Sequence, residues 1–137
     1  MVKLNNTSIG ILGGSFDPAH KGHLIISKIA LKKIKLKKIY WIVTKKNPFK
    51  IKTFLSLKDR INQAKKISNK IRKIEVIYID DIIKSSRSIK VIKYILKMKK
   101  PKNLYFIVGS DILFNFHKWH EWKRIVKLAK LIVFSRK

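Results

Sequence analysis

The chain has 137 residues, 46% of them hydrophobic, which is enough apolar material for a packed core and excludes a disordered chain. It has no cysteine, which excludes a disulfide framework and a thiolate zinc site. No apolar run approaches the roughly 20 residues of a membrane-spanning helix. We therefore expect a soluble, cytoplasmic protein with one domain over residues 1–137 and no membrane partner.

The formal net charge is +27, from 34 Lys and Arg against 7 Asp and Glu. Only five of these basic residues are arginine, and the 29 lysines occur in every segment. Specific recognition of phosphates and bases favours arginine, which donates two parallel hydrogen bonds. We therefore expect no specific nucleic-acid partner, attribute the lysines to drift in an AT-rich coding sequence, and expect non-specific polyanion binding at low salt.

The first predicted elements are a buried strand over residues 8–12 and a helix after a glycine turn. Gly13 and Gly14 would let the backbone turn sharply and approach a ligand closely. Asp17 is a favourable N-cap and Pro18 suits the first helical position. Apolar residues then follow at helical spacing at Leu24, Ile25 and Ile29, with Leu31 a further candidate.

Two histidines lie at the start of this predicted helix. The unpaired N–H groups of a first helical turn and its partial positive charge attract phosphate. His20 and His23, three residues apart, would share one face, and Gly22 would leave room there for a substrate. Because each imidazole can donate a hydrogen bond, we interpret the pair as phosphate ligands rather than as simple caps.

Residues 39–43 are predicted to form a second strand. The loop that follows includes Lys46 and Lys50 and lies where open parallel sheets bind ligands; a solvated loop is an equally good interpretation. Ser56 is expected to cap a helix to about Ser68, with Ile61, Ala64 and Ile67 inward.

A third strand is predicted over residues 74–79. Asp80 and Asp81 follow it, and we interpret them as a solvated strand end rather than as a metal site, because adjacent side chains in an extended segment point apart. A helix is then expected to open between Ser85 and Ser88 and to end before Pro101.

Residues 104–108 form a predicted fourth strand, and Leu131–Phe134 a fifth. Strands that alternate with helices indicate an α/β fold with a five-stranded, mainly parallel sheet, for which we predict the strand order 3-2-1-4-5. The turn at Gly109 would then face the same cleft as Gly13. Asp111 is predicted to orient a substrate or accept from a ribose hydroxyl, with an N-cap as the alternative.

An aromatic segment, residues 114–122, follows the fourth strand. A ring near the cleft could stack on a planar ligand, whereas Trp122 is expected in the core. The pair His117 and His120 does not predict zinc, because no carboxylate or thiolate completes a ligand set.

The run Gly13-Gly14-Ser15-Phe16-Asp17-Pro18, with His20, Gly22 and His23, resembles the signature of the nucleotidyltransferases that carry a histidine-x-glycine-histidine motif. The later segment Gly109-Ser110-Asp111 with Trp119, the loop Asn47-Pro48-Phe49-Lys50, and Arg136 resemble the bacterial nicotinate-nucleotide adenylyltransferases. The resemblance covers nearly the whole chain. It implies a Rossmann-like nucleotidyltransferase fold and transfer of an adenylyl group from ATP to nicotinate mononucleotide, which gives deamido-NAD and pyrophosphate.

The resemblance also implies roles for residues. His20 and His23 would bind the ATP phosphates and stabilise the transition state. Asp111 would orient a ribose, and Trp119, with the adjacent His120, would hold the nicotinate group. The remaining implied phosphate ligands are Gly13, Gly14, Ser15, Phe16, Lys46, Lys50 and Arg136.

The acceptor phosphate is already ionised, so alignment and charge neutralisation suffice for in-line attack without a covalent enzyme intermediate. Mg²⁺ held mainly by the ATP phosphates, with no metal ligand from the protein, would complete the site.

The chain departs from the family pattern in two places. The segment around Ser88, an implied nicotinate contact, only loosely matches the tyrosine-threonine segment of the family. Family members also continue past the fifth strand to a second signature, isoleucine-serine-serine-threonine-x-isoleucine-arginine, which this chain lacks. We expect either a fragment of a longer protein or a truncated form.

Two alternative functions stay open. One is phosphopantetheine adenylyltransferase or another small nucleotidyltransferase such as a cytidylyltransferase. The other is a truncated, non-catalytic nucleotide or polyanion binder. Oligomeric state and preference between nicotinate and nicotinamide nucleotides are left open.

Overall fold

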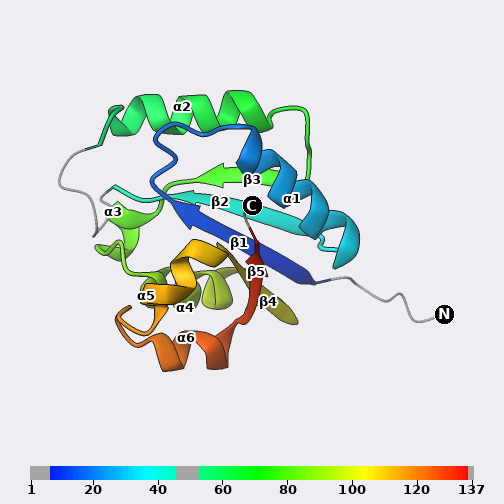
Figure 1. Cartoon of the computed structure of the whole chain (residues 1–137), viewed down its shortest axis with the longest axis vertical. Coiled ribbons are helices and arrows are strands. Elements are labelled where there is room, and N and C mark those ends of the chain that lie inside the picture. Colours follow the sequence, from blue (N-terminus) through cyan, green and yellow to red (C-terminus); the bar gives the residue numbers. More distant parts are fainter. Residues whose placement is uncertain (1–6, 46–52, 136–137) are drawn as a thin grey trace.

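The computed structural model describes residues 7–45 and 53–135, and its centre is a parallel sheet of five strands (Figure 1). The order is β3-β2-β1-β4-β5, which confirms the predicted order 3-2-1-4-5. The strands are β1 (Ser8–Gly14), β2 (Lys38–Val43), β3 (Ile74–Ile77), β4 (Asn103–Gly109) and β5 (Lys130–Phe134). All four neighbouring pairs are parallel. Their carboxyl ends therefore meet at one edge of the sheet.

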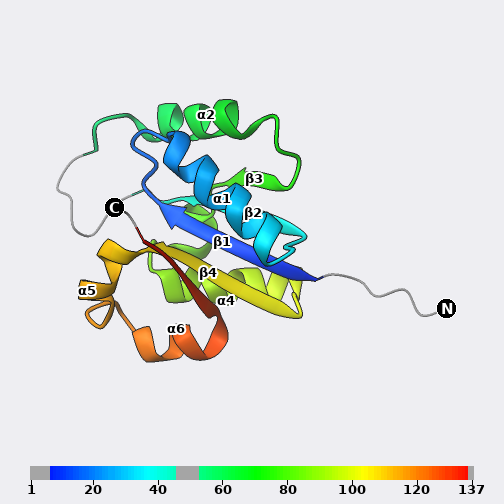
Figure 2. The same cartoon turned by 45° about the vertical axis from the view of Figure 1, so that its right-hand side comes forward.

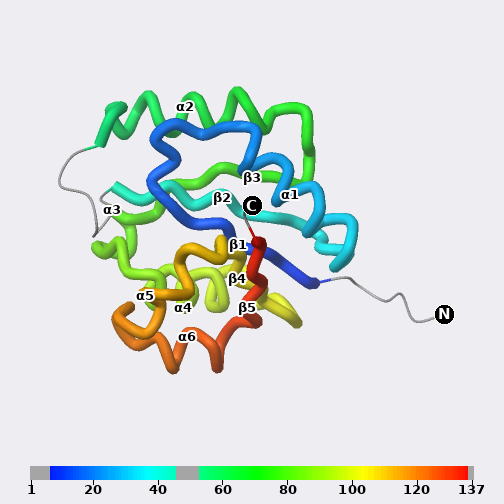
Figure 3. Tube along the Cα trace, in the orientation of Figure 1, coloured from blue at the N-terminus to red at the C-terminus, as the bar shows by residue number. Residues whose placement is uncertain are grey.

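Helices cover both faces of this sheet (Figure 2). On one face lie α1 (Lys21–Lys33) and α2 (Leu57–Ser68). On the other lie α4 (Ser88–Lys99), α5 (Leu113–Phe116) and α6 (Trp122–Leu128), with α3 (Asp80–Ile83) next to α4 and the 3-10 turn η1 (Ser110–Ile112) next to α5. Figure 3 traces the crossovers that connect the strands through these helices. In the described part of the chain no helix is both long and apolar enough to span a membrane.

The core follows from the alternation of side chains along the strands. Ile11 and Phe106 are buried on the α4 and α6 side, whereas Leu12 and Ile107 are buried on the α1 and α2 side. Gly10, in the middle of β1, is a point of close approach, because a Cβ there would lie 2.9 Å from Leu36 Cδ1. Helices thus cover both faces of β1, and its carboxyl end, which leads into the loops, is the part of the strand left accessible.

The first helix differs from the prediction in its start and in its inward face. It begins at Lys21 with His20 as N-cap, not after Asp17. Of the four predicted apolar positions, Leu24 and Leu31 pack against the core, whereas Ile25 is 56% exposed and Ile29 38% exposed. The buried residues of the helix are Ser27 and Ala30. The apolar periodicity of α1 predicts the wrong buried residues, because the small residues Ser27 and Ala30 lie where the helix packs against the sheet. The prediction for α2 is confirmed: Ser56 Oγ accepts from Asp59 N at 3.1 Å.

The third strand is shorter than predicted and its end is not solvated. It ends at Ile77, and Asp80 begins the one-turn helix α3 with 5% of its surface exposed. The interpretation of Asp80 as part of a solvated strand end is therefore wrong, although Asp81 is exposed. Buried carboxylates need hydrogen-bond partners, and those of Asp80 lie in the candidate site.

Candidate active site

The segment between β1 and α1 forms the centre of the site. Every described glycine has a negative φ. The prediction that Gly13 and Gly14 make the sharp turn is therefore wrong. Phe16 makes it, with φ 49°, just before the cis peptide bond Asp17–Pro18. A Cβ on Gly14 would meet nothing within 4 Å. Gly14 therefore borders open space at the carboxyl end of β1, where a ligand can approach the backbone.

Asp17 is not the helix cap but a link to a distant segment. Its carboxylate accepts hydrogen bonds from the backbone N–H groups of Phe54 and Leu55, the latter at 2.6 Å. These residues lie just ahead of α2. Asp17 therefore ties the entrance of α1 to the entrance of α2, a role that no local pattern could have predicted.

His20 and His23 form a capping box at the start of α1. His20 Nδ1 accepts from Gly22 N at 3.0 Å, and His23 Nδ1 accepts from His20 N at 3.1 Å. A ring nitrogen that accepts carries no proton, so the neutral form of each imidazole carries its proton on Nε2. The two ring centroids are 4.1 Å apart. Each ring therefore has one N–H donor, Nε2–H, that is not used by the cap.

This geometry refines the prediction for the helix terminus. Gly22 N–H, one of the first-turn donors expected to bind phosphate directly, is occupied by the His20 ring instead. A donor that polarises one nitrogen of a ring strengthens the donor on the other. The positive end of α1 is therefore presented to a ligand through imidazole N–H groups as well as through backbone.

Gly22 makes room for the His20 ring rather than for a substrate. A Cβ at this position would lie 2.7 Å from His20 Cε1 and 2.9 Å from His20 Nδ1. Real Cβ atoms essentially never approach so closely, so a side chain here would displace the ring. The spacing histidine-x-glycine-histidine is thus required by the capping box itself.

We expect Gly22→Ala to disrupt this box without unfolding the protein. Ala favours a helix by up to about 1 kcal/mol relative to Gly, and loss of the cap costs about 1 kcal/mol, so the melting temperature should be nearly unchanged. In long-range ¹H–¹⁵N spectra, the His20 ring of the unaltered chain should show the Nε2–H tautomer, and the variant should show a mixture. Lys28→Ala, an exposed position of the same helix, is the control. An unchanged His20 ring spectrum in Gly22→Ala would contradict this geometry.

Buried aromatic rings pack against His23. The Phe16 ring stacks on Trp41 at a centroid distance of 5.3 Å and lies 4.6 Å from His23. Trp41 is fully buried and its Nε1–H donates to Ser27 Oγ at 2.9 Å. Phe16 itself is 2% exposed. Its position is therefore that of a support for His23, while its predicted contact with phosphate stays a prediction.

A buried arginine that sequence reasoning missed joins the ends of two strands. Arg60, on α2, is 2% exposed. Its guanidinium donates to Ser15 O at 3.0 Å, to Thr44 O at 2.7 Å and to Lys45 O at 3.1 Å. Ser15 follows β1 and Thr44 follows β2, so one side chain holds both loops that border the site. The sequence does contain a signal: Arg60 lies on the face of the predicted helix that is otherwise apolar and expected to point inward.

Asp80 completes this network from the other side. Its Oδ2 accepts from Lys45 N at 2.7 Å and from Ser86 Oγ at 2.6 Å. The Lys45 peptide is thus held by Arg60 through its carbonyl and by Asp80 through its N–H. Nearby, burial and, to a smaller extent, Asp81 and Asp80 together raise the pKa of Tyr78 to about 12, against a lowering effect of Arg60. The Tyr78 phenol is therefore neutral at physiological pH.

The second half of the site follows β4. In the β1–β4 pair Leu12 lies opposite Ile107, so the turns after both strands lie at one edge of the sheet. Asp111 is exposed within η1, whose N-cap is Gly109, so the alternative role of Asp111 as an N-cap is wrong.

The predicted nicotinate contacts lie beyond this turn. Trp119 is half-buried, with its ring 5.3 Å from Phe116 and 5.9 Å from Phe106. His120 is exposed, with Nε2 3.6 Å from Glu121 Oε2, and Ser88 is the half-buried first residue of α4. One side of Trp119 is therefore engaged by the core, which fixes the ring.

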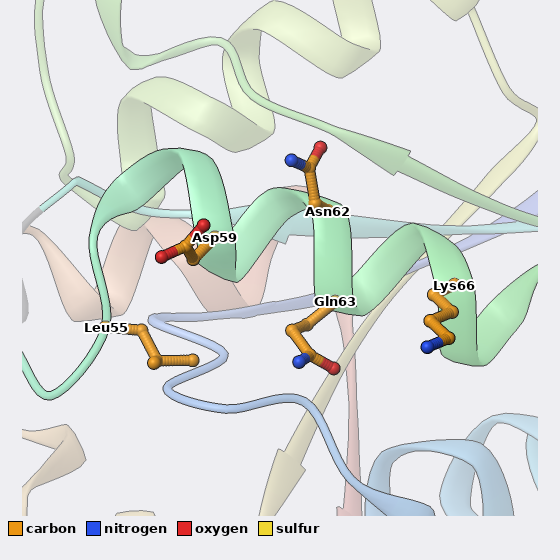
Figure 4. A pocket seen from close by; sticks show the side chains of 5 residues that line it. All are labelled: Leu55, Asp59, Asn62, Gln63 and Lys66. Atoms are coloured by element: carbon orange, nitrogen blue, oxygen red, sulfur yellow. The ribbon is translucent and has the colours of Figure 1, made fainter.

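Three predicted phosphate ligands, Lys46, Lys50 and Arg136, lie outside the described residues. Within residues 7–45 and 53–135, no group of three His, Asp or Glu is placed to hold a metal ion. A surface hollow of about 230 Å³ lies along α2, lined by Leu55, Asp59, Asn62, Gln63 and Lys66 (Figure 4). None of the predicted site residues lines it, although Leu55, whose N–H binds Asp17, does.

Comparison with known proteins gives a consistent result. The family model described as cytidylyltransferase-like matches residues 11–137. A protein of Pelagibacter ubique named "Probable nicotinate-nucleotide adenylyltransferase" is 52% identical over 130 residues, which are 95% of this chain and 72% of the relative. A protein of Rhizobium meliloti with the same name is 32% identical, over 94% of this chain and 69% of the relative. The structure of Plasmodium falciparum nicotinic acid mononucleotide adenylyltransferase complexed with NaAD has a TM-score of 0.74 at 23% identity, over 94% of this chain and 64% of that one.

Proposed function

Because the chain belongs to the nicotinate-nucleotide adenylyltransferases of the cytidylyltransferase-like family, we propose that it transfers the adenylyl group of ATP to nicotinate mononucleotide. The products are deamido-NAD and pyrophosphate, and the reaction serves NAD biosynthesis. The protein acts on these soluble nucleotides in the cytoplasm.

The observation that carries the proposal is the pair of imidazoles at the start of α1. Both have Nδ1 occupied by backbone N–H groups and Nε2–H unused by the cap. Two N–H donors beside the positive end of a helix suit the oxygens of a phosphate chain. Donors of this kind stabilise negative charge as it develops during transfer.

The proposed reaction is an in-line displacement at the α-phosphorus. A phosphate oxygen of nicotinate mononucleotide attacks, the bond between the α-phosphorus and the bridging oxygen breaks, and pyrophosphate leaves with the bonding electron pair. The attacking oxygen is already ionised, so no residue must remove a proton. His20 and His23 hold the phosphate chain and stabilise its developing charge, and Gly14 leaves open space beside the reacting group.

The acceptor would bind at the carboxyl end of β4. Asp111 orients a ribose hydroxyl, and Trp119, fixed by Phe106 and Phe116, lies against the nicotinate ring, with His120 and Ser88 near its carboxylate. Lys46, Lys50 and Arg136 supply further phosphate contacts. Mg²⁺ accompanies ATP in this proposal. The predicted donors at the site are N–H groups, which bind phosphate oxygens and cannot ligate a cation, so the ATP phosphates would hold the metal ion and it would neutralise part of their charge.

A panel of acceptors tests the proposed substrate. The purified chain is given ATP and Mg²⁺ with nicotinate mononucleotide, nicotinamide mononucleotide or phosphopantetheine, and pyrophosphate release is followed. We expect the highest kcat/KM with nicotinate mononucleotide. A higher value with phosphopantetheine would replace this proposal by the phosphopantetheine adenylyltransferase alternative. Binding of ATP without turnover of any acceptor would indicate a non-catalytic nucleotide binder.

A further inference from the structure

The edge of the sheet opposite the site gathers a large part of the positive charge. Parallel strands place all the turns that enter them at one edge. Backbone contacts confirm this placement: Lys37 N donates to Ser8 O at 2.8 Å, and Ile39 N donates to Lys73 O at 2.8 Å. Figures 1 and 2 show the turns that enter β2, β3 and β4 on the same side of the molecule. We call the residues at 32–38, 65–73, 97–102 and 127–130 the amino edge.

The charge of the amino edge is far above that of the rest of the chain. These four segments contain sixteen of the 34 basic residues and no acidic residue, in less than a fifth of the chain. All of them except Lys38, which pairs with Glu75 at 2.7 Å, are exposed. They are Lys32, Lys33, Lys35, Lys37, Lys38, Lys65, Lys66, Lys70, Arg72, Lys73, Lys97, Lys99, Lys100, Lys102, Lys127 and Lys130. Lysines do occur in every segment, but their density is not uniform.

Ordinary helix chemistry accounts for only part of this charge. Four helices end here, and each helix C-terminus is equivalent to about half a negative charge, which amounts to roughly two charges against sixteen. Of the seven acidic residues, only Glu75, which pairs with Lys38, lies beside the amino edge. The other six belong to segments that follow the strands on the site side or open the next helix: Asp17, Asp59, Asp80, Asp81, Asp111 and Glu121. Drift toward lysine predicts many lysines, but it does not predict this separation of charge.

We propose that the amino edge binds the phosphodiester backbone of a nucleic acid, independently of sequence, while the active site at the opposite edge stays open. Lys73, Lys37, Lys102 and Lys130 enter or directly precede β3, β2, β4 and β5. Strands about 4.8 Å apart spread this row over about 19 Å. Phosphates recur about every 3.4 Å along one strand of a duplex, so the row spans about five of them.

The composition of the edge favours a nucleic acid over a lipid surface. Stable binding at a membrane interface inserts apolar side chains in addition to charge. The exposed large hydrophobic residues on the described part of the amino edge are Met98 and Leu128. Lysines act as point charges toward phosphate, which suits binding without base readout.

The test compares two variants with equal net charge. The edge variant combines Lys37→Gln, Lys73→Gln, Lys102→Gln and Lys130→Gln. The control combines Lys28→Gln, Lys58→Gln, Lys90→Gln and Lys123→Gln, all exposed and outside the edge. Binding to a labelled single-stranded RNA of about 20 nucleotides and mixed sequence is measured by anisotropy at several salt concentrations. Each lost phosphate contact should reduce the salt slope by about 0.7, so we expect a reduction of about three in the edge variant.

At about 0.1 M salt, where charges more than about 10 Å away are screened, we expect the edge variant to bind at least tenfold more weakly and the control variant within threefold of the unaltered chain. Equal weakening of RNA binding in both variants would overturn the proposal, since binding would then depend on the net charge of the protein and not on the amino edge. Binding of phosphatidylglycerol vesicles that depends on the edge, without such binding of RNA, would overturn it in favour of a membrane.

A second measurement uses the unaltered chain and does not depend on folding of the variants. Limited acetylation of lysines, read by mass spectrometry with and without RNA, should show protection at Lys37, Lys73 and Lys102 and none at Lys28 and Lys90. Uniform protection of all lysines would overturn the proposal. Neither experiment requires turnover, so failure of the proposed enzymatic activity would be recognised separately.

Discussion

Replacement of His20 by alanine should lower kcat for adenylyl transfer by about 100- to 1,000-fold, the usual cost of removing one hydrogen-bond donor that stabilises developing charge. In the proposed mechanism the His20 Nε2–H is such a donor, because Nδ1 accepts from Gly22 N. The same change removes the N-cap of α1, which costs about 1 kcal/mol of stability. Pyrophosphate release and the free energy of unfolding in urea measure the two effects.

His20→Asn separates catalysis from capping. Asparagine is among the best N-caps, so this variant should recover the stability lost in His20→Ala. Its short side chain does not reproduce the position of Nε2–H, so its kcat should stay low. A His20→Asn enzyme with nearly full activity would show that the ring acts only as a cap, the interpretation that the sequence analysis set aside.

Loss of Arg60 should have the largest effect on stability. Arg60→Met removes donors from the carbonyl oxygens of Ser15, Thr44 and Lys45, which are partly buried. A buried acceptor without a partner costs about 1–3 kcal/mol. Because these three acceptors are only partly buried, we expect a loss at the low end of their sum, about 3–5 kcal/mol, which is a large share of the 5–15 kcal/mol typical of a domain. The shift of the urea midpoint measures it.

Arg124→Met is the matched control, because Arg124 is exposed and reaches only Glu121, at 3.3 Å. It should change the unfolding free energy by less than about 1 kcal/mol. Arg60→Lys should be intermediate in stability and should raise the KM for ATP, since one ammonium group cannot hold both loops in place. Equal stability of Arg60→Met and Arg124→Met would contradict the role assigned to Arg60.

The fold was predictable because its signals are local and repeated. Apolar runs separated by helical segments predict parallel strands, and the order 3-2-1-4-5 would bring the turns after the first and fourth strands to one edge of the sheet. The order β3-β2-β1-β4-β5 confirms this. The cap at Ser56 was equally predictable, because a serine at the right spacing needs only its own helix.

What escaped prediction depends on partners far away in the sequence. Asp17 has the residue type and position of an N-cap, but its carboxylate binds the N–H groups of Phe54 and Leu55. Asp80 follows a predicted strand and is expected to be solvated there, yet it is buried and accepts hydrogen bonds from Lys45 N and Ser86 Oγ. Arg60 lies on the inward face of its predicted helix, four residues before Ala64, but the sequence does not show which carbonyl oxygens it binds. Nothing in the local pattern shows that three loops converge on these side chains.

The sequence locates the histidine motif correctly but does not show how the two rings are held. It suggests that Gly22 leaves space for a substrate, whereas in the structure the His20 ring occupies that space. The capping and the ligand-binding interpretations were treated as alternatives. The capping box combines them, because the cap occupies Nδ1 and thereby fixes the proton on Nε2, where a phosphate would need it.

The most direct test of the central proposal is identification of the product. The 137-residue chain is incubated with ATP, Mg²⁺ and nicotinate mononucleotide, and the products are separated and weighed by mass spectrometry. We predict deamido-NAD and pyrophosphate in equal amounts, and almost none of either with His20→Asn. Hydrolysis of ATP without a dinucleotide, or no product from a folded chain that binds both nucleotides, would contradict the proposal.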